Sequence, residues 1–131
     1  MGYHIILRAT VRIKPEYADF IRSEYFFNDT YPYESLPAPW SILLGLWQSL
    51  GIGHHFYLFD LTDDIFTFEI QKKLSDHGIS LERNYKEFMY HVILPVADKI
   101  LSCEIEHDDY GCYRYKLTDA TIRSWTKDSI Y

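Results

Sequence analysis

The chain lacks most of the features that mark secreted or membrane proteins. It has two cysteines among 131 residues, which is too few for a disulfide framework and favours a reducing, intracellular compartment. Its most apolar region, Pro32 to Gly53, is interrupted by Pro37 and Pro39, and the unbroken part is well short of the ~20 residues that a membrane-spanning helix needs. No basic segment followed by an apolar run stands near the start. We therefore expect a cytoplasmic protein with no membrane partner.

Basic residues and catalytic motifs are also scarce. Thirteen Lys and Arg against 19 Asp and Glu give a net charge of −6, whereas nonspecific nucleic-acid binding needs a basic surface that displaces counterions. The sequence has no glycine-rich phosphate loop, no Gly-x-Ser-x-Gly motif and no His-Glu-x-x-His motif. We therefore predict no nucleic-acid partner and no cofactor, and we favour a noncatalytic protein over the common enzyme classes.

Aromatic residues are abundant, at 18% of the chain, and 12 of them are tyrosines. A tyrosine buries a large ring and keeps a polar hydroxyl, which suits protein interfaces and the walls of ligand sites. A core rich in β-sheet also favours aromatic residues. The composition leaves both explanations open.

The first segment, Tyr3 to Tyr25, predicts a strand that runs straight into a helix. The odd positions from Tyr3 to Ile13 are all apolar, and the even positions are polar except for Ile6. Such alternation places one face of a sheet against a core and the other face against water or a polar partner. Pro15 fits the first turn of a helix, because its missing N–H costs nothing there.

The later patterns predict a single α+β domain over residues 1–131 with an antiparallel sheet. The arrangement is a ferredoxin-like β-α-(α)-β-β-α-β core with an added C-terminal strand and a short terminal helix. After the first helix we expect a loop at Asn28–Pro39, an almost wholly apolar helix at Trp40–Leu50, and a hairpin of Phe56–Leu61 and Ile65–Lys73. A long helix at Leu81–Leu101 follows, capped by Ser80 and kinked at Pro95. The chain then forms a hairpin of Ser102–Asp108 and Cys112–Leu117 and a last helix that is capped by Asp119 and ends at Trp125.

Charged residues of alternating sign are expected on the sheet face that points away from the helices. If the first strand lies between the third and the fourth, the sign of the charge alternates from strand to strand. The fifth strand is positive (Arg114 and Lys116), the fourth negative (Glu104 and Glu106), the first positive (Arg8 and Arg12) and the third negative (Glu69). Opposite charges on neighbouring strands favour this strand order by ~0.2–1 kcal/mol per pair. The face is then a solvated surface with weak ion pairs, a site for a polar ligand or partner sheet, or the interface of a dimer that stacks it on its copy.

Two candidate sites lie between residues 25 and 50. An aromatic cluster is a candidate wall for an apolar ligand pocket closed by the Asn28–Pro39 loop, or else it anchors that loop to the core; its residues are Tyr25, Phe27, Tyr31, Tyr33, Trp40 and Trp47. The Trp40–Leu50 helix is apolar on nearly all sides, so it is either buried or packed against a second chain through Leu44 and Trp47.

Two further clusters are candidates for metal binding or catalysis. The His107-Asp108-Asp109 segment, with Glu104 and Glu106 nearby, is the densest set of possible metal ligands, but aspartate is expected in a hairpin turn for conformational reasons alone. Glu87 and His91 are four residues apart on the long helix, on the side opposite its apolar stripe, where solvent is the expected neighbour. We predict no metal site and no catalytic residue.

The opening, a strand followed by Ile13-Lys14-Pro15-Glu16 and an aromatic-bearing helix, resembles the start of small dimeric α/β-barrel proteins such as the cofactor-free antibiotic-biosynthesis-type monooxygenases. The resemblance implies a similar fold and dimerisation, and it includes no catalytic residue.

Two functional hypotheses follow. The first is a noncatalytic structural or protein-interaction protein that self-associates, with a homodimer favoured, through the open sheet face (Arg8, Arg12 and Glu69) or the apolar helix. The second is a small-molecule-binding protein or cofactor-free enzyme that uses the aromatic cluster, with Arg8, Glu69 or His91 as polar groups.

Overall fold

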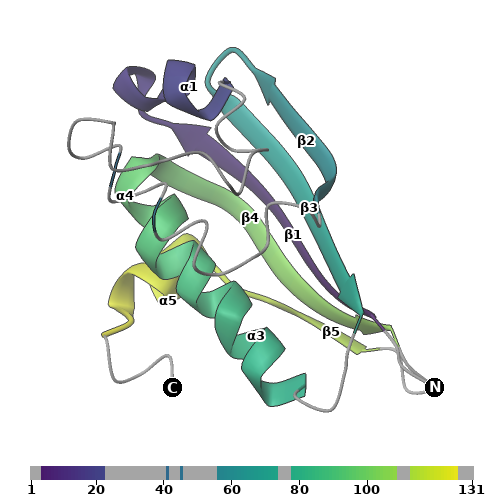
Figure 1. Cartoon of the computed structure of the whole chain (residues 1–131). Coiled ribbons are helices and arrows are strands. Elements are labelled where there is room, and N and C mark those ends of the chain that lie inside the picture. The colour runs from purple at the N-terminus through teal and green to yellow at the C-terminus, as the bar shows by residue number, and fades with distance from the viewer. Residues whose placement is uncertain are drawn as a thin grey trace.

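The structure of the chain, a computed structural model, describes residues 4–22, 41, 45, 56–73, 78–108 and 113–126. These residues form an α+β fold in which five antiparallel strands make one sheet (Figure 1). In spatial order the strands are β2 (Phe56–Thr62), β3 (Ile65–Lys73), β1 (His4–Ile13), β4 (Ala97–Asp108) and β5 (Tyr113–Lys116). The first strand therefore lies between β3 and β4, as the charge pattern predicted.

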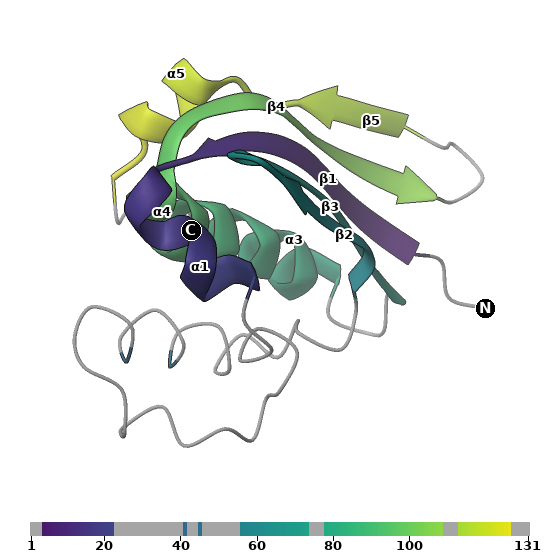
Figure 2. The same ribbon diagram turned by 90° about the horizontal axis from the view of Figure 1, so that it is seen from above.

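The helices are few, and most of them lie on one side of the sheet. They are α1 (Pro15–Arg22), α3 (Gly78–Glu87), the π-helix η4 (Phe88–Ile93), α4 (Leu94–Val96) and α5 (Asp119–Ser124). Figure 2 shows α1, α3 and α4 on the same side of the sheet. The short α5 contacts β4 and η4. Among the described residues, no helix covers the middle of the opposite face, which we call the open face.

The core lies between the sheet and these helices. The odd-numbered residues of β1 from Ile5 to Ile13 are all buried, which confirms the alternation predicted for this strand. Phe66, Phe68 and Ile70 of β3 pack in the same cluster as the helix residues Tyr85 and Phe88. The Tyr85 hydroxyl donates a 2.6 Å hydrogen bond to the carbonyl oxygen of Ile5, which satisfies a buried polar group.

The prediction of a long helix at Leu81–Leu101 is wrong at both ends. Its first part, α3, begins at Gly78 rather than after a Ser80 cap, and helical structure ends at Val96, where β4 begins. The distortion expected near Pro95 is the π-helix η4, where the N–H of Leu94 donates to the carbonyl oxygen of Met89, five residues earlier.

Two β-bulges explain why the start of β4 was mistaken for a helix. The pairing of β4 with β1 shifts register twice, between Thr10 and Val11 and between Arg12 and Ile13. Each shift adds one residue to β4, so its inward-facing residues are three apart there: Ala97, Ile100 and Cys103. This spacing resembles the period of a helix more than the period of two that marks a strand.

The last helix is capped by Thr118, not by Asp119 as predicted. The Thr118 hydroxyl oxygen accepts a hydrogen bond from the N–H of Thr121 at 3.1 Å. The Asp119 carboxylate instead accepts from the N–H of Ile100 at 2.8 Å and from Nε of Arg123 at 2.9 Å, so it ties α5 to the bulged part of β4.

The remaining boundaries agree with the sequence to within a few residues where they are described. The first hairpin is present, with a turn at Asp63-Asp64 in which Asp63 has a φ of 55°. The returning strand β5 is shorter than the predicted Cys112–Leu117. The predicted loop at Asn28–Pro39 lies outside the described residues, and so does the Trp40–Leu50 helix apart from the isolated positions 41 and 45.

Candidate functional site

A row of charged side chains crosses the open face. The strand register sets Arg8 of β1 opposite Glu69 of β3 on one side and opposite Glu104 of β4 on the other, and it sets Glu104 opposite Lys116 of β5. Leu58 of β2 lies opposite Glu69 at the far end. We call Glu69, Arg8, Glu104 and Lys116 the charged row; its signs alternate from one strand to the next.

A second row, of hydroxyl side chains, runs parallel to the first. Thr10 of β1 lies opposite Thr67 of β3 and opposite Ser102 of β4. Asp60 of β2 lies opposite Thr67 and ends this hydroxyl row. Side chains two positions apart on a strand share a face, so each hydroxyl stands next to a member of the charged row.

Arg8 is the centre of the ion pairs on this face. Its Nε donates to the carboxylate of Glu69, and its Nη1 donates to Oε1 of Glu104 and to Oε1 of Glu106, each at 3.2 Å. The three carboxylate side chains are only 14–20% exposed, whereas Arg8 is 37% exposed. The pairs are therefore better shielded from water than ordinary surface ion pairs, which contribute ~0–1 kcal/mol.

Neighbouring polar groups complete this network. Nη1 of Arg114 lies 3.9 Å from Oε1 of Glu104 and 3.8 Å from Oε1 of Glu106. The side-chain amide of Gln71 donates to Oε2 of Glu69 at 3.3 Å. The arrangement holds the charged side chains in fixed positions on the sheet.

The Arg8 guanidinium keeps its proton in this environment. Burial alone would lower its pKa, but the hydrogen bonds to Glu106 and Glu69 and the charges of both carboxylates outweigh burial and raise the pKa above its ordinary value. The centre of the open face is consequently a permanent positive charge among three carboxylates.

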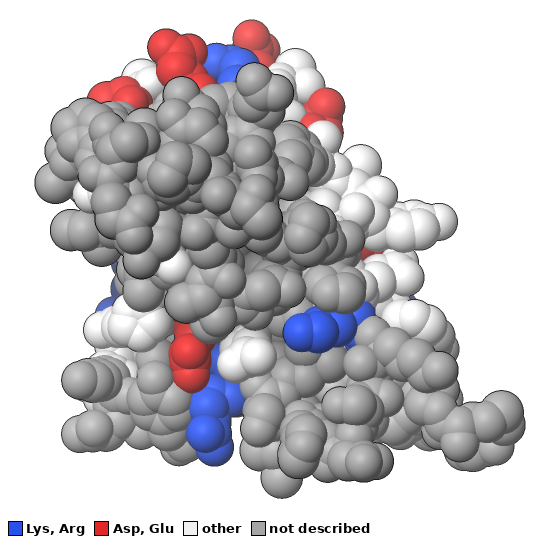
Figure 3. Space-filling model, in the orientation of Figure 1, with Lys and Arg blue, Asp and Glu red and all other residues white. Residues whose placement is uncertain are grey.

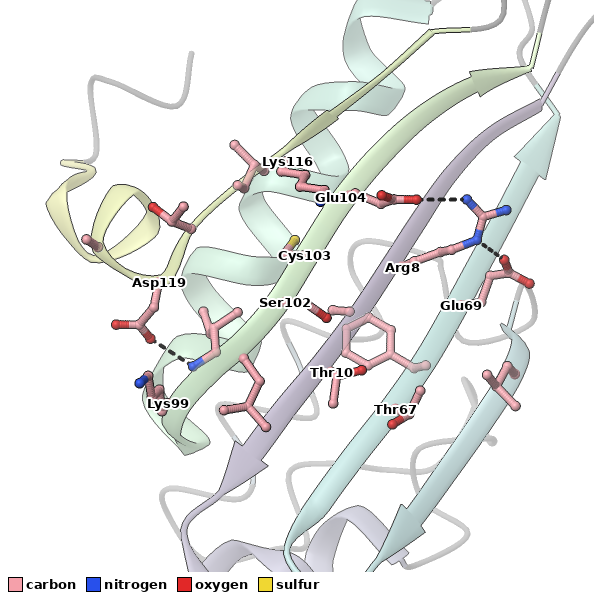
Figure 4. Close-up of a pocket in the computed structure, with 18 residues that line it drawn as sticks. Arg8, Thr10, Thr67, Glu69, Lys99, Ser102, Cys103, Glu104, Lys116 and Asp119 are labelled. Atoms are coloured by element: carbon pink, nitrogen blue, oxygen red, sulfur yellow. Dashed lines mark hydrogen bonds and ion pairs between the residues drawn. The ribbon is translucent and has the colours of Figure 1, made fainter.

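A groove with a volume of about 910 Å³ occupies the open face beside these rows (Figure 4). Its lining includes Thr10, Thr67 and Ser102 of the hydroxyl row, all four members of the charged row, and the segment that runs from Lys116 into the start of α5 at Ala120. Leu58 and Leu101 also line it, and both are unusually exposed for leucine, at 46% and 42%. The groove thus combines polar groups with apolar surface, as ligand and partner sites do.

Cys103 is the one thiol among the described residues, and it is unsuited to nucleophilic chemistry. Burial, with a smaller contribution from the Glu104 carboxylate, raises its pKa to about 12, so the thiol stays protonated near neutral pH. Figure 4 shows its sulfur close to the β4 ribbon rather than among the charged side chains.

The structure brings together some of the residues that the sequence singled out. Arg8 and Glu69 are in contact at the centre of the open face. Arg12 is exposed farther along β1, opposite Ile65 and Lys99, so it lies apart from the charged row. The proposed aromatic cluster and the proposed helix contacts lie outside the described residues: Tyr25, Phe27, Tyr31, Tyr33, Trp40, Leu44 and Trp47.

The two other clusters do not form sites within the described part of the chain. His107 is buried on β4, opposite Ile5, while Asp109 lies outside the described residues. The described residues contain no group of three or more His, Cys, Asp or Glu side chains that could hold a metal ion. His91 lies in η4, with its ring edge-to-face against Tyr90 at a centroid distance of 5.0 Å.

The hydroxyl row was not predicted from the sequence, although a signal for it exists. Threonine and serine are ordinary strand residues and carry no motif. Once Arg8, Glu69 and Glu104 are aligned across the sheet, the residues two positions along each antiparallel strand align as well, and these are Thr10, Thr67 and Ser102. The alignment of one row therefore specifies the next.

No helix in the described residues has the length and apolar character needed to span a membrane. In comparisons with known proteins, no family model, no curated protein and no solved structure matches the chain.

Proposed function

We propose that this chain is a noncatalytic interaction protein that self-associates through the open face of its sheet. One observation carries the proposal: in the described residues, a sheet face whose middle no helix covers bears a row of charges whose sign alternates from strand to strand, and three of them, Glu69, Arg8 and Glu104, are partly buried and joined by ion pairs. Charges held in fixed positions recognise a partner without an ordering cost, which favours binding. The cytoplasmic location inferred from the low cysteine content belongs to the same proposal.

We also assign the core to the ferredoxin-like arrangement, extended by β5. This assignment is supported by two strand–helix–strand units, β1-α1-β2 and β3-α3-β4, whose helices lie on one side of the sheet. Such a sheet has one face free for a partner. The fold supports many functions, so the functional proposal is based on the face and not on the fold.

The size of the open face indicates a reversible association. Five strands about 4.8 Å apart, with about eight residues each at about 3.3 Å per residue, give an area of about 600 Å² per copy. Two such faces bury about 1,200 Å² in total, at the low end for specific protein interfaces. We therefore expect a dimer that dissociates in the micromolar range.

The test is the oligomeric state measured by sedimentation velocity across the micromolar range. Thr10→Arg places a long charged side chain in the middle of the open face and blocks face-to-face stacking in any orientation. Asp19→Asn is the matched control, because it changes the charge by the same amount at an exposed position on α1. We expect the wild type and the control to dimerise and Thr10→Arg to remain monomeric.

Two results would overturn the proposal. One is a wild-type chain that stays monomeric at every concentration tested. The other is a folded Thr10→Arg variant that associates as strongly as the wild type, which would direct attention to a surface other than the open face. Circular dichroism confirms the fold of each variant.

A second candidate function is small-molecule binding, as a binding protein or a cofactor-free enzyme. The observation that favours it is the groove of about 910 Å³, in which Thr10, Thr67 and Ser102 lie beside Leu58 and Leu101. Native mass spectrometry of the purified protein without added ligand tests it. A defined extra mass that Thr67→Val abolishes supports this function, and the bare mass of the chain opposes it.

A further inference from the structure

We propose that two copies of this chain stack their open faces about a two-fold axis that runs parallel to the strands, midway between β1 and β4. This inference rests on the self-association proposed above and specifies its geometry. It places Arg8 opposite the partner's Glu104, and Glu69 opposite the partner's Lys116.

The order of charges in the charged row supports this axis. From β3 to β5 the row reads Glu69, Arg8, Glu104 and Lys116, so the signs are negative, positive, negative and positive. A two-fold axis parallel to the strands reverses the order of the strands in the second copy. When the axis passes between β1 and β4, every charge in the row faces the opposite sign. The row is therefore complementary to itself, as an isologous interface requires.

Two other placements of the axis oppose like charges. An axis that passes along β1 places Arg8 opposite the partner's Arg8 and Glu69 opposite the partner's Glu104. An axis perpendicular to the strands and lying along the charged row places each residue opposite its own copy. Like charges across an interface cost several kcal/mol, so the charged row favours the proposed axis over these two. Outside the row, the same rotation sets Arg12 opposite the partner's Lys99, a pair of like charges at the bulged end of β4.

The hydroxyl row is compatible with the same axis. The rotation brings Thr10 opposite the partner's Ser102, and two hydroxyl groups can each donate and accept a hydrogen bond. Stacked sheets pack about 10 Å apart with their strands about 30° from parallel, which leaves room for side chains from both faces. The groove of about 910 Å³ then lies at the interface and not on an outer surface.

The alternating charged row is a feature of the open face. Figure 3 views the other side, on which the helices lie; there a basic side chain lies among acidic ones at the top, and an acidic side chain lies beside a basic one farther down.

A charge exchange between Glu69 and Lys116 tests the register. These two residues are three strands apart, about 14 Å, so they do not form a pair within one chain. In a homodimer of Lys116→Glu, each new carboxylate faces the partner's Glu69. In a homodimer of Glu69→Lys, each new ammonium faces the partner's Lys116. We expect each variant alone to dimerise at least tenfold more weakly than the wild type.

The mixture of the two variants is the decisive measurement. In the heterodimer, Glu69 of one chain faces the partner's unchanged Lys116, and the two reversed residues also face opposite charge. We expect an equimolar mixture to restore dimerisation to within about threefold of the wild type. One variant is labelled uniformly with ¹⁵N, so that native mass spectrometry distinguishes the heterodimer from both homodimers.

Glu69→Lys places a cation beside Arg8, so its folding is checked by circular dichroism. If it does not fold, Glu69→Gln replaces it, and the heterodimer with Lys116→Glu is still expected in excess over both homodimers. The register is overturned if both variants dimerise like the wild type, or if mixing gives no more heterodimer than random pairing. In either case self-association itself stands. A monomeric wild type overturns both proposals.

Discussion

Removing the Arg8 guanidinium is expected to destabilise the monomer through the carboxylates that it leaves behind. Arg8→Met keeps a long unbranched side chain on β1 and eliminates the hydrogen bonds to Glu69, Glu104 and Glu106. The three carboxylates, each at most 20% exposed, would then repel one another, and the more distant Arg114 and the exposed Lys116 opposite Glu104 would offset this repulsion only in part.

The magnitude lies between the values for exposed and buried ion pairs. An exposed pair contributes ~0.2–1 kcal/mol, and breaking a buried pair costs ~3–5 kcal/mol. Because Arg8 is 37% exposed, solvent screens part of its interaction, and we expect a loss of about 2 kcal/mol in the free energy of unfolding. For a domain of this length, that corresponds to a decrease in Tm of about 6–10 °C.

Arg12→Met is the matched control, since it makes the same chemical change on the same strand and the same face. Arg12 is exposed and lies opposite Ile65 and Lys99, so we expect a change within about 0.5 kcal/mol. Urea denaturation at pH 7 measures both variants. Equal stability of the two variants would refute the reasoning.

Two further predictions concern pH and the groups around β4. Burial raises the pKa of Cys103 from 9.0 to about 12, so the free energy of unfolding should fall as the pH rises through that interval. The fall should be less steep in Cys103→Ala. If urea denaturation gives the same dependence on alkaline pH for the wild type and the variant, this prediction is wrong. The hydrogen bond from Ile100, followed by the contact with Arg123, holds the pKa of Asp119 below its ordinary value of 3.8. Asp119→Ala should therefore cost about 1 kcal/mol at pH 7, and this difference should vanish as the pH falls below 3.8; a thermal melt at each pH measures it.

The sequence predicted the parts of the fold that follow a simple period. β1 alternates between buried and polar residues except at Ile6, and the hairpin of β2 and β3 has a clear turn at Asp63-Asp64. The start of β4 was misassigned because two bulges give it a spacing of three, and bulges depend on the partner strand, which local sequence does not specify. The cap of α5 was misassigned because Thr118 and Asp119 are adjacent and both are capping residues.

The charged row was predictable from two patterns. The alternation of apolar and polar residues along each strand specified the face of each charged residue, and the opposite signs of the charges indicated which strands are neighbours. The contact of Arg8 with three carboxylates at once required the register, which places Glu69 and Glu104 on either side of it. The exposed leucines of the groove were not predicted. Leu58 lies next to an irregularity in the pairing of β2 with β3, and Leu101 is the extra residue of a bulge in β4.

The bulges of β4 change the curvature of the sheet without changing which side chains lie on its open face. From Ser102 to Ala97, β4 is five residues long over a distance that β1 covers in three, from Thr10 to Ile13. The extra residues bend β4, which arches there in Figure 2. Deletion of one of these extra residues would flatten the arch. It would turn no side chain to the other face, because the residues on either side of each bulge already point to the same faces as their partners on β1. A change in strand length can thus adjust how closely the sheet fits another surface, while the residues that recognise that surface stay in place.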